Sequence, residues 1–557
     1  MPGEMVNSSR NTILINVRER LILGVTAIFL LFGGTKMVAQ DTLAKEEVKV
    51  LKDFDAQLLK INRIRNYPKP KVTDSLVQKG IFSSRAIDRN IPLLLQDPSY
   101  PALEGSLPSQ KYNTFVSLAG GFPRRYDISA GHAIQKEGIL ELLLKGNLSQ
   151  AESKNIQYQG FRNQNLGASG RYFIDSEWDL NFNAGIDRGI RYLYGHPNAD
   201  SLNAAALRRQ VTIYDIGLRG NFMDDQRSKE LSVGFYFSQL QDSYATSERN
   251  VRMDGLYTPL KTGDHQLDLL VSLDFTTLTD TLTRKLNNFL FKPSYQYFSD
   301  RFIINAGINI YNHRDEFKYF PEIEVKLPVS GDQMIAIIGI DGGLLKNDYH
   351  SLYRFNNYIQ SRLDTLANTN LFEIHAGVEG AIAGLEYSVT IGWRQMNDFA
   401  LFNFEPNGGN AGFFRVIFDD VNATYVQAQL VWHPMEELTL DIDGALYFYA
   451  LDRETKAWHR SNLQSSITAN WYPLNSDLSF SGQVWIEGGI PYLAVDGTSS
   501  SLETIIDLSL EGRYRINESF DAFLQINNLT NQRWSRWLNY PQFGTNLLAG
   551  VRYRVKG

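Results

Sequence analysis

Cysteine is absent from all 557 residues of the sequence. Without a thiol the chain forms no disulfide, has no sulfur ligand for a metal, no cysteine nucleophile and no lipid-modified N-terminal cysteine. A basic excess is also lacking, because the formal net charge is −6, so nothing indicates nucleic acid as a partner. Long apolar runs are lacking beyond the N-terminus, and the mean hydropathy of −0.27 excludes a bundle of transmembrane helices.

Aromatic residues and glycine are abundant instead. The sequence has 28 Tyr, 32 Phe and 43 Gly, and 43% of its residues are apolar. The apolar content excludes a disordered chain. The mixture favours pleated strands with aromatic girdles and close turns.

The N-terminus has the pattern of a secretory signal peptide. Arg18 and Arg20 precede an apolar run at 21–32, and small residues follow. The run has about 12 residues, whereas a membrane-spanning helix needs about 20. We therefore predict a signal peptide at 1–40 that is cleaved near Ala39 or Gln40, with a retained membrane anchor as the alternative.

From about residue 112 to the end, apolar and polar residues alternate with a period of two. Trp178, Leu180 and Phe182 fall on one side of a strand, and Asp179 and Asn181 fall on the other. A transmembrane strand has this pattern, with lipid on one face and water or packed polar groups on the other. An exported membrane protein without apolar helices must span with strands that close into a barrel. A soluble β-sandwich would show the same alternation, so the alternation alone does not distinguish it from a membrane barrel. The connections between the strands distinguish the two folds.

The connections are of two kinds that alternate along the chain. Short ones have an aromatic residue on entry, a polar turn and an apolar residue on exit, as at 172–178, 297–302, 432–438, 471–478 and 514–520. Long ones lie at 191–208, 346–370, 397–411, 489–503 and 531–543. Short periplasmic turns and long extracellular loops are typical of outer-membrane β-barrels.

We predict an all-β fold over 112–557, namely a transmembrane antiparallel β-barrel of about 22 strands with both ends in the periplasm. If 251–256 were loop instead of strand, the count would fall to about 20. The predicted strands are 113–121, 126–135, 139–150, 161–175, 178–190, 209–222, 230–242, 248–258, 265–276, 287–297, 302–312, 318–328, 333–345, 371–382, 385–396, 413–433, 438–449, 461–473, 478–488, 504–516, 520–530 and 544–555.

Residues 41–111 differ from the barrel region. Their start is strongly charged, and six prolines between 68 and 108 interrupt the rest. We expect a periplasmic N-terminal segment that is extended or loosely packed, or that lies partly in the barrel mouth.

The last third of the chain carries a family resemblance. The stretches Ile526-Asn-Asn-Leu-Thr-Asn-Gln532, Trp537-Leu-Asn-Tyr-Pro541 and Gly550-Val-Arg-Tyr553 resemble the closing hairpin of TonB-dependent receptors, especially those of Bacteroidetes. Ala457-Trp-His-Arg460, followed by 471–478, is similar to the same family. The resemblance covers about residues 280–557 and implies an outer-membrane barrel for uptake.

The N-terminal region departs from that family. Residues 41–111 are too few for the family's plug domain and lack its glycine-rich motifs. Glu46-Glu-Val-Lys-Val50 could pass for a TonB box, but so short a pattern is common by chance. The pattern Glu47-Val-Lys-Val-x-Lys52, then Lys60-Ile61, Pro68 and Pro70, resembles instead the plugless, receptor-like barrels of the same phylum. The C-terminus also departs, because Tyr553 is followed by four further residues where such barrels usually end in an aromatic residue.

Motifs for chemistry are missing. The eight histidines form no HExxH pattern, and no GxSxG or clustered acid pair is present, so we expect no enzyme and no catalytic residue. Asp341 with Asp348, and Asp419 with Asp420, supply too few oxygen ligands for a calcium cage. We therefore predict no metal site and no cofactor.

Charged residues on the polar faces are the candidates for a functional site. A charge on the lipid face costs about 2–4 kcal/mol at the midplane, so these side chains should face the lumen. They would either give a pore its charge selectivity or pair with one another and fill the interior. The candidates are Asp179, Asp187, Asp441, Asp443, Glu511, Arg513 and Arg515.

The size of the barrel raises a functional question, because about 22 strands without a plug leave a wide bore. The 41–111 segment, inward-folded loops or a partner protein should fill it. We expect passage of solutes across the outer membrane without a conventional plug. The alternative is a scaffold subunit of a larger outer-membrane complex. Expected partners are outer-membrane lipid and proteins of such a complex or of the periplasm, with TonB left open and nucleic acid excluded.

Overall fold

The computed structural model describes residues 112–153, 155–224, 229–313, 316–331, 333–474 and 476–556. The signal peptide predicted at 1–40 and the segment predicted at 41–111 lie outside the described residues.

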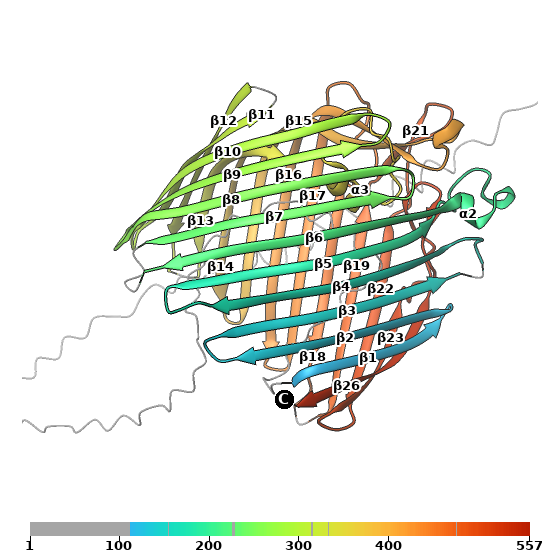
Figure 1. Cartoon of the computed structure of the whole chain (residues 1–557), viewed down its shortest axis with the longest axis horizontal. Coiled ribbons are helices and arrows are strands. Elements are labelled where there is room, and N and C mark those ends of the chain that lie inside the picture. The colour runs from blue at the N-terminus through green and yellow to red at the C-terminus, as the bar shows by residue number, and fades with distance from the viewer. Residues whose placement is uncertain are drawn as a thin grey trace, which may run out of the picture. The chain divides into compact units, whose positions relative to one another are not determined.

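The described chain forms one antiparallel sheet of 22 strands that closes on itself (Figure 1). The strands are β1 (Tyr112–Phe122), β2 (Arg125–Lys136), β3 (Leu140–Glu152), β4 (Gly160–Phe173), β5 (Trp178–Tyr192), β6 (Arg208–Met223), β7 (Glu230–Asp242), β8 (Thr246–Thr262), β9 (His265–Thr279), β10 (Thr283–Phe298), β11 (Ile303–His313), β12 (Glu316–Pro328), β13 (Ile335–Leu345), β14 (Thr369–Ile382), β15 (Leu385–Phe404), β16 (Phe414–Met435), β17 (Leu438–Leu451), β18 (Leu463–Trp471), β19 (Leu478–Gly488), β22 (Ile505–Arg515), β23 (Phe520–Asn527) and β26 (Asn546–Lys556).

The remaining elements lie in the connections. They are the short helices η1 (Ala199–Ser201), α2 (Ala204–Leu207), α3 (Tyr349–Phe355) and η2 (Gly408–Asn410), and the short strands β20 (Pro491–Leu493), β21 (Ser499–Ser501), β24 (Ser535–Trp537) and β25 (Tyr540–Pro541). No helix in the described part of the chain is both long and apolar enough to cross a membrane.

The first and last strands close the ring. In β1, Phe115 lies opposite Arg554 of β26, and Leu118 lies opposite Val551. Every other strand pairs with the neighbours that precede and follow it in the ring. Closure satisfies the backbone groups of the strands and leaves no open edge, which is what a sheet in lipid requires.

The predicted strand count is confirmed. The segment 251–256 lies within β8, where Val251 pairs with Phe237 of β7, so the alternative count of 20 strands is wrong. One predicted boundary is also wrong, because β15 runs on to Phe404 through most of the loop expected at 397–411. The polar pair Asn397-Asp398 forms a bulge within the strand, and Asp398 has a φ of 58°. A bulge inserts an extra residue without ending the pairing.

The long connections all lie at one end of the barrel, which also has the short turns β1–β2, β7–β8 and β9–β10, and the connections at the other end are short (Figure 1). The turn between β14 and β15 is Ala383-Gly384, and both residues have positive φ. Such a two-residue turn matches the right-handed twist of its strands, and glycine adopts it at little cost. The long connections therefore share one end, as expected from the sequence, but that end also has short turns, which the expectation did not include.

Apolar side chains cover the outer face. Leu166, Ile338 and Ile391 are more than half exposed at the centres of their strands. Near the short turns, exposed aromatic rings pair across strands, with Trp471 and Phe480 5.5 Å apart and their rings stacked. An apolar band with an aromatic girdle is the outer surface that a bilayer solvates.

Candidate functional site

The inner face of the barrel can be identified at β6. Val211 and Ile213 are buried there, whereas Tyr214 and Ile216 on the opposite face are exposed. Val211 and Ile213 belong to an apolar cluster that also contains residues of β10, β15 and β16. Only the interior of a closed ring can bring such distant strands together, so the odd-numbered residues of β6 point inward.

That cluster lies at one end of the barrel, and we call it the mouth cluster. It joins inner-face residues of the wall to the connections β5–β6, β13–β14, β15–β16 and β23–β26. Its members are Leu193, Ala199, Leu207, Val211, Ile213, Leu240, Leu278, Leu286, Tyr349, Leu352, Tyr353, Phe355, Tyr358, Ile359, Leu363, Leu366, Ala400, Phe402, Phe404, Phe413, Phe414, Val416, Trp537 and Tyr540.

Aromatic rings from different connections meet at its centre. Tyr358 stacks on Tyr540 with ring centroids 3.7 Å apart, and Phe414 lies edge-on to Trp537 at 5.3 Å. The Tyr540 hydroxyl donates to the Gly412 carbonyl at 2.5 Å, and the Tyr194 hydroxyl donates to the Pro541 carbonyl at 3.0 Å. Four connections that start far apart on the ring are therefore packed together.

The β13–β14 connection, residues 346–368, contributes more residues to the cluster than any other connection. It contains α3, whose first turn is capped by Asp348, since the Asp348 carboxylate accepts from the Ser351 N–H at 2.8 Å. Tyr349, Leu352 and Phe355 of α3 are buried. The helix therefore forms at an N-cap, as the sequence favours, and packs an apolar face into the mouth.

Charged side chains of the wall also hold this connection. The Arg209 guanidinium of β6 lies 2.7 Å from Asp242 of β7, and the Tyr349 hydroxyl bonds to both at 2.6 Å. The same guanidinium donates to the carbonyls of Asn357 and Ile359 at 2.8 and 2.7 Å. Both charged side chains are almost fully buried. The wall thus supplies a buried ion pair, and the backbone of the connection accepts charge-assisted hydrogen bonds from its arginine.

A second group of charges lies at the start of the connection. Glu248 of β8 accepts from the backbone N–H groups of Tyr349 and His350 at 2.7 and 3.0 Å. Lys346 lies 2.8 Å from Asp274 of β9 and 2.9 Å from Asp348. Burial opposes ionisation of Asp348, yet Lys346, His350 and the Ser351 N–H together outweigh it and hold the pKa of Asp348 below its ordinary value.

The connection β17–β18 also packs on the β15–β16 hairpin. Its Trp458 joins a smaller apolar cluster with Phe399 and Leu401. The Nδ1 of His459 lies 2.8 Å from the Phe402 carbonyl, which accepts, so His459 carries its proton there. Complete burial and, to a smaller degree, the Arg536 cation lower the pKa of His459 to about 3. His459 is therefore neutral in the closed mouth.

The predicted lumen candidates on β5 lie on the face that β6 identifies as inner, because cross-strand partners share a face. Asp187 pairs with Ile213, and Asp179 pairs with Asn221. Asp179 accepts hydrogen bonds from Arg171 at 2.8 Å and from Asn221 at 2.9 Å. The Asn165 amide donates to Asp187.

The other candidates lie on β17 and β22. Asp441 and Asp443 are on the face of β17 opposite the exposed Leu446 and Phe448, and Asp443 is itself exposed. On β22, Glu511, Arg513 and Arg515 lie opposite the exposed Leu510 and Tyr514, and Glu511 is 2.8 Å from Arg513. The seven residues thus occupy three separate strands and do not form one site.

The carboxylates considered for metal binding have other partners. Asp348 caps α3, and Asp419 accepts from the Arg453 guanidinium at 3.1 Å. Asp341 accepts from the Gly342 N–H, and Asp420 accepts from the Asp398 N–H. Among the described residues, no three or more metal-ligating side chains come together.

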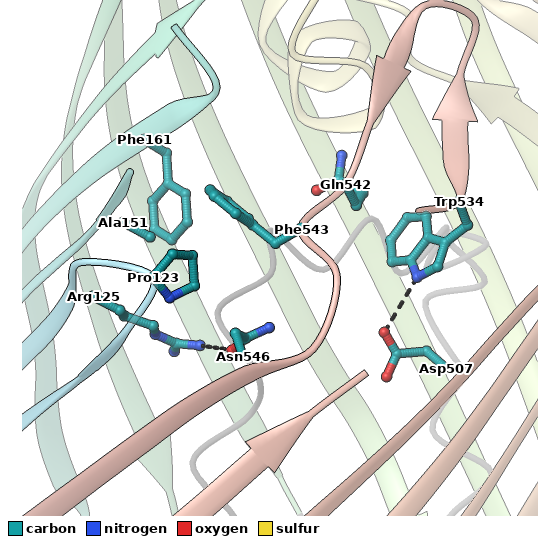
Figure 2. Close-up of a pocket in the computed structure, with 9 residues that line it drawn as sticks. All are labelled: Pro123, Arg125, Ala151, Phe161, Asp507, Trp534, Gln542, Phe543 and Asn546. Carbon is teal, nitrogen blue, oxygen red and sulfur yellow. Dashed lines mark hydrogen bonds between the residues drawn. The ribbon is translucent and has the colours of Figure 1, made fainter. Parts of the chain in front are cut away.

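A recess lies on the inner wall beneath the β23–β26 connection, next to the seam where β1 meets β26 (Figure 2). Its lining includes Phe161 and Phe543, which are in edge contact at 6.2 Å. Arg125 donates to Asn546 at 3.1 Å, and the Trp534 indole donates to Asp507 at 3.3 Å (Figure 2). The first bond joins two wall strands, and the second ties the β23–β26 connection to the wall.

Sequence reasoning did not find the mouth cluster. The available signal was the number of large apolar residues in the long connections, such as Leu352, Phe355, Tyr358, Trp537 and Tyr540, which would be out of place in solvated loops. Inward-folded loops were one of the three expected ways to fill the bore, and the structure shows them in the described residues.

No protein-family profile matches the sequence. No curated protein matches it. Solved structures do match. A mutant of the ferric enterobactin receptor PfeA of Pseudomonas aeruginosa aligns with a TM-score of 0.60 at 12% identity, over 80% of this chain and 81% of that one. The fold is that of an outer-membrane receptor barrel.

Two further structures agree with this fold. The copper transporter OprC aligns with a TM-score of 0.60 at 13% identity, over 80% of this chain and 82% of that one. The FrpB iron transporter of Neisseria meningitidis aligns with a TM-score of 0.63 at 10% identity, over the same shares. At these identities the likeness establishes the barrel fold of the chain alone.

Proposed function

We propose that the protein is an outer-membrane barrel through which solutes pass, and that it is a plugless, receptor-like relative of the TonB-dependent receptors of Bacteroidetes. The observation that carries this proposal is the closed barrel of 22 strands with an apolar, aromatic-girdled outer face and a charged inner face. Proteins with similar barrels are named as a ferric enterobactin receptor, a copper transporter and an iron transporter. The signal peptide expected at 1–40 would export the chain to this membrane.

The inner face supports passage of polar solutes without a cofactor or a reaction. Asp441 and Asp443 face the lumen in this proposal, and the exposed Asp443 is accessible to water. Other wall charges are paired, such as Lys326 with Glu379 at 2.8 Å. A wall with both signs of charge favours hydrated solutes and binds no single ion tightly. We assign no catalytic role to any residue.

The experiment that tests passage uses the full-length protein in liposomes. Wild type is compared with a variant in which residues 349–366 are replaced by a short Gly-Ser linker, and solute entry is followed by liposome swelling. Because the mouth cluster fills one end, we expect slow entry through wild type and fast entry through the variant. Both proteins must show the heat-dependent gel shift of a folded barrel. No entry through either folded protein would rule out passage.

The mouth cluster favours a second candidate, a scaffold subunit of a larger outer-membrane complex. A barrel that its own loops close serves as an anchor without leaking. Partners would be proteins of that complex, or a periplasmic protein that binds residues 41–111; whether TonB is among them is open. Native gels of gently solubilised membranes test this candidate. A protein that runs only as a monomer contradicts it.

A further inference from the structure

We propose that three arginines on the outer face of the barrel bind the phosphate groups of lipid in the outer leaflet of the membrane. They are Arg162 of β4, Arg188 of β5 and Arg208 of β6, and we call them the arginine patch. The proposal rests on the function proposed above, since it needs the barrel to be in the outer membrane. Its test measures lipid that stays bound to the protein, which neither requires nor reports passage of solutes, so failure of one proposal can be told from failure of the other.

The patch lies on the face that contacts lipid. Leu166, Ile186 and Tyr214 are exposed on the outer faces of β4, β5 and β6. Each arginine of the patch is separated from the exposed residue of its own strand by an even number of positions, so it points the same way. The three arginines are themselves exposed, and their strands are neighbours in the ring. They therefore form one continuous surface.

The height of the patch matches the headgroups of a bilayer. Tyr172 lies on the outer face of β4 near the short-turn end, and Arg162 lies ten residues from it, near the long connections. Ten residues of a strand extend about 34 Å, and a strand tilted by about 40° covers about 26 Å of the membrane normal over that length. The apolar band of such a barrel is about 25 Å tall, and a charge costs little at its edges. A guanidinium at this height meets headgroups instead of acyl chains.

Neutral amides hold the arginines of the patch. The Gln150 Oε1 accepts from Arg162 at 2.6 Å, and the Gln210 Oε1 accepts from Arg188 at 2.8 Å and from Arg208 at 2.9 Å. Among the residues that the structure describes, none of the three arginines forms an ion pair with a carboxylate. The patch therefore keeps its positive charge, and two of its guanidinium groups share one oxygen atom.

Glu152 of β3 lies beside the patch but has other partners. Its carboxylate accepts from the Gln150 amide at 2.9 Å and lies 3.9 Å from Arg124 in the β1–β2 turn. It therefore leaves the charge of the arginine patch in place.

Such an arrangement favours an anionic ligand. Two guanidinium groups on one oxygen repel each other, and the repulsion grows where headgroups and acyl chains replace bulk water. A phosphate group between them would turn this repulsion into attraction, because its oxygens accept charge-assisted hydrogen bonds from both. Arginine suits this role, since its planar fork matches the geometry of phosphate. The hydrogen bonds to Gln210 orient both forks and leave their other N–H groups for the ligand.

The surface next to the patch indicates that the phosphate belongs to a lipid. The exposed Leu166 and Ile186 lie on the same face, toward the middle of the apolar band. A lipid with a phosphorylated headgroup contacts both parts, with its phosphate on the arginines and its acyl chains on the apolar side chains. A free phosphate ion would contact only the arginines.

The experiment uses the full-length protein in a neutral detergent and native mass spectrometry, which counts the lipid molecules that stay bound. The probes are lipid A, a phosphorylated glycolipid, and the same lipid after removal of its phosphates. Wild type should bind lipid A and should bind the dephosphorylated form about tenfold or more weakly, because charge-assisted hydrogen bonds are lost. Inorganic phosphate in excess should not displace the lipid.

Arg188→Gln with Arg208→Gln should weaken the binding of lipid A by about tenfold or more. Arg188→Lys with Arg208→Lys keeps both charges but loses the forks, so its affinity should fall between that of the glutamine variant and that of wild type. The matched control is Lys136→Gln with Arg301→Gln, which removes two exposed cations at the short-turn end and should bind lipid A as wild type does.

The heat-dependent gel shift establishes in each case that the barrel is folded. If the double glutamine variant does not fold, Arg162→Gln takes its place. The proposal is overturned if the folded glutamine variant binds lipid A as tightly as wild type, or if the control loses as much affinity. It is equally overturned if wild type binds the dephosphorylated lipid as tightly as lipid A. Displacement of lipid A by inorganic phosphate would also overturn it, because the patch would then be a site for free anions.

Discussion

The Arg209 guanidinium and the Asp242 carboxylate lie 2.7 Å apart in the mouth of the barrel, and both side chains are almost completely shielded from water. They come from β6 and β7, yet the groups that complete their hydrogen bonds come from the β13–β14 connection. The wall strands therefore supply both charges, and the β13–β14 connection supplies the groups that complete their hydrogen bonds.

Neutralising Asp242 should loosen the loop without unfolding the barrel. In Asp242→Asn, Arg209 keeps its charge but loses its buried partner, a change that typically costs about 3–5 kcal/mol. We expect faster amide hydrogen exchange across α3 and residues 356–361, measured by mass spectrometry. The matched control is Asp254→Asn, whose partners Arg252 and Arg219 lie 3.2 and 3.7 Å away on the wall. Equal protection of α3 in both variants would contradict the assigned role of Asp242.

The centre of the mouth cluster should be sensitive to a cavity. Phe414 is fully buried between Trp537 and Tyr540, so Phe414→Ala should cost about 3–5 kcal/mol of loop packing. Near-ultraviolet circular dichroism should weaken while the heat-dependent gel shift remains. Phe317→Ala removes a ring that is 60% exposed on the outer face and serves as control. An unchanged spectrum for Phe414→Ala would argue against a packed mouth.

The two faces of β4 should respond in opposite ways to the same charge. Leu166 is 65% exposed at mid-strand, so Leu166→Arg should lower the stability of the barrel in lipid by about 2–4 kcal/mol. Asn165→Arg places the same group beside Asp187 on the inner face and should cost little. Folding titrations in urea with lipid vesicles measure both. If the two variants lose the same stability, the assignment of the faces is wrong.

Acidification should weaken the packing around His459. Its pKa is lowered to about 3 in the closed mouth, and an exposed histidine titrates near 6.5. A lowered pKa means that the stabilisation is complete above about pH 6.5 and is lost as the pH falls toward 3. The Arg536 cation, close by, adds to the cost of protonation.

Near-ultraviolet circular dichroism of the aromatic residues, recorded from pH 7.5 to pH 4, checks this, because Trp537 stacks on His459 at 5.4 Å. The signal should fall across this range in wild type. His459→Gln, which does not titrate, should remove the part of the change that wild type shows below pH 6.5. Identical pH profiles would show that another group is responsible.

The carboxylates of β17 should set the preference between ions in the barrel with residues 349–366 replaced. Asp441→Asn with Asp443→Asn removes two negative charges from the proposed lumen wall, so reversal potentials across a salt gradient should shift toward anions. Glu511→Gln with Arg513→Gln removes one charge of each sign from a pair 2.8 Å apart and should shift them little. A shift of equal size in both double variants would contradict a lumenal role of Asp441 and Asp443.

The barrel was predictable because the features that determine it involve residues close together in the sequence. Alternation of side chains follows directly from the two-residue repeat of a strand, and turn chemistry separates short hairpins from long connections. The predicted end of β15 was wrong because of the bulge at Asn397-Asp398. Two consecutive polar residues have the same sequence pattern in a bulge and in a loop.

The mouth was not predictable in this way. Arg209 and Tyr349 are separated by 140 residues, and Tyr194 and Pro541 by 347. No period or motif in the sequence relates such positions, since their contact depends on where closure of the ring puts each strand end.

By itself, the sequence determined a barrel of about 22 strands, the phase of those strands and the positions of the long connections, because each depends on neighbours along the chain. Only the tertiary structure decided that the long connections fold inward and that a buried ion pair receives one of them. The physical reason is that burial and charge pairing depend on distances across the ring, which exist only once β1 has met β26.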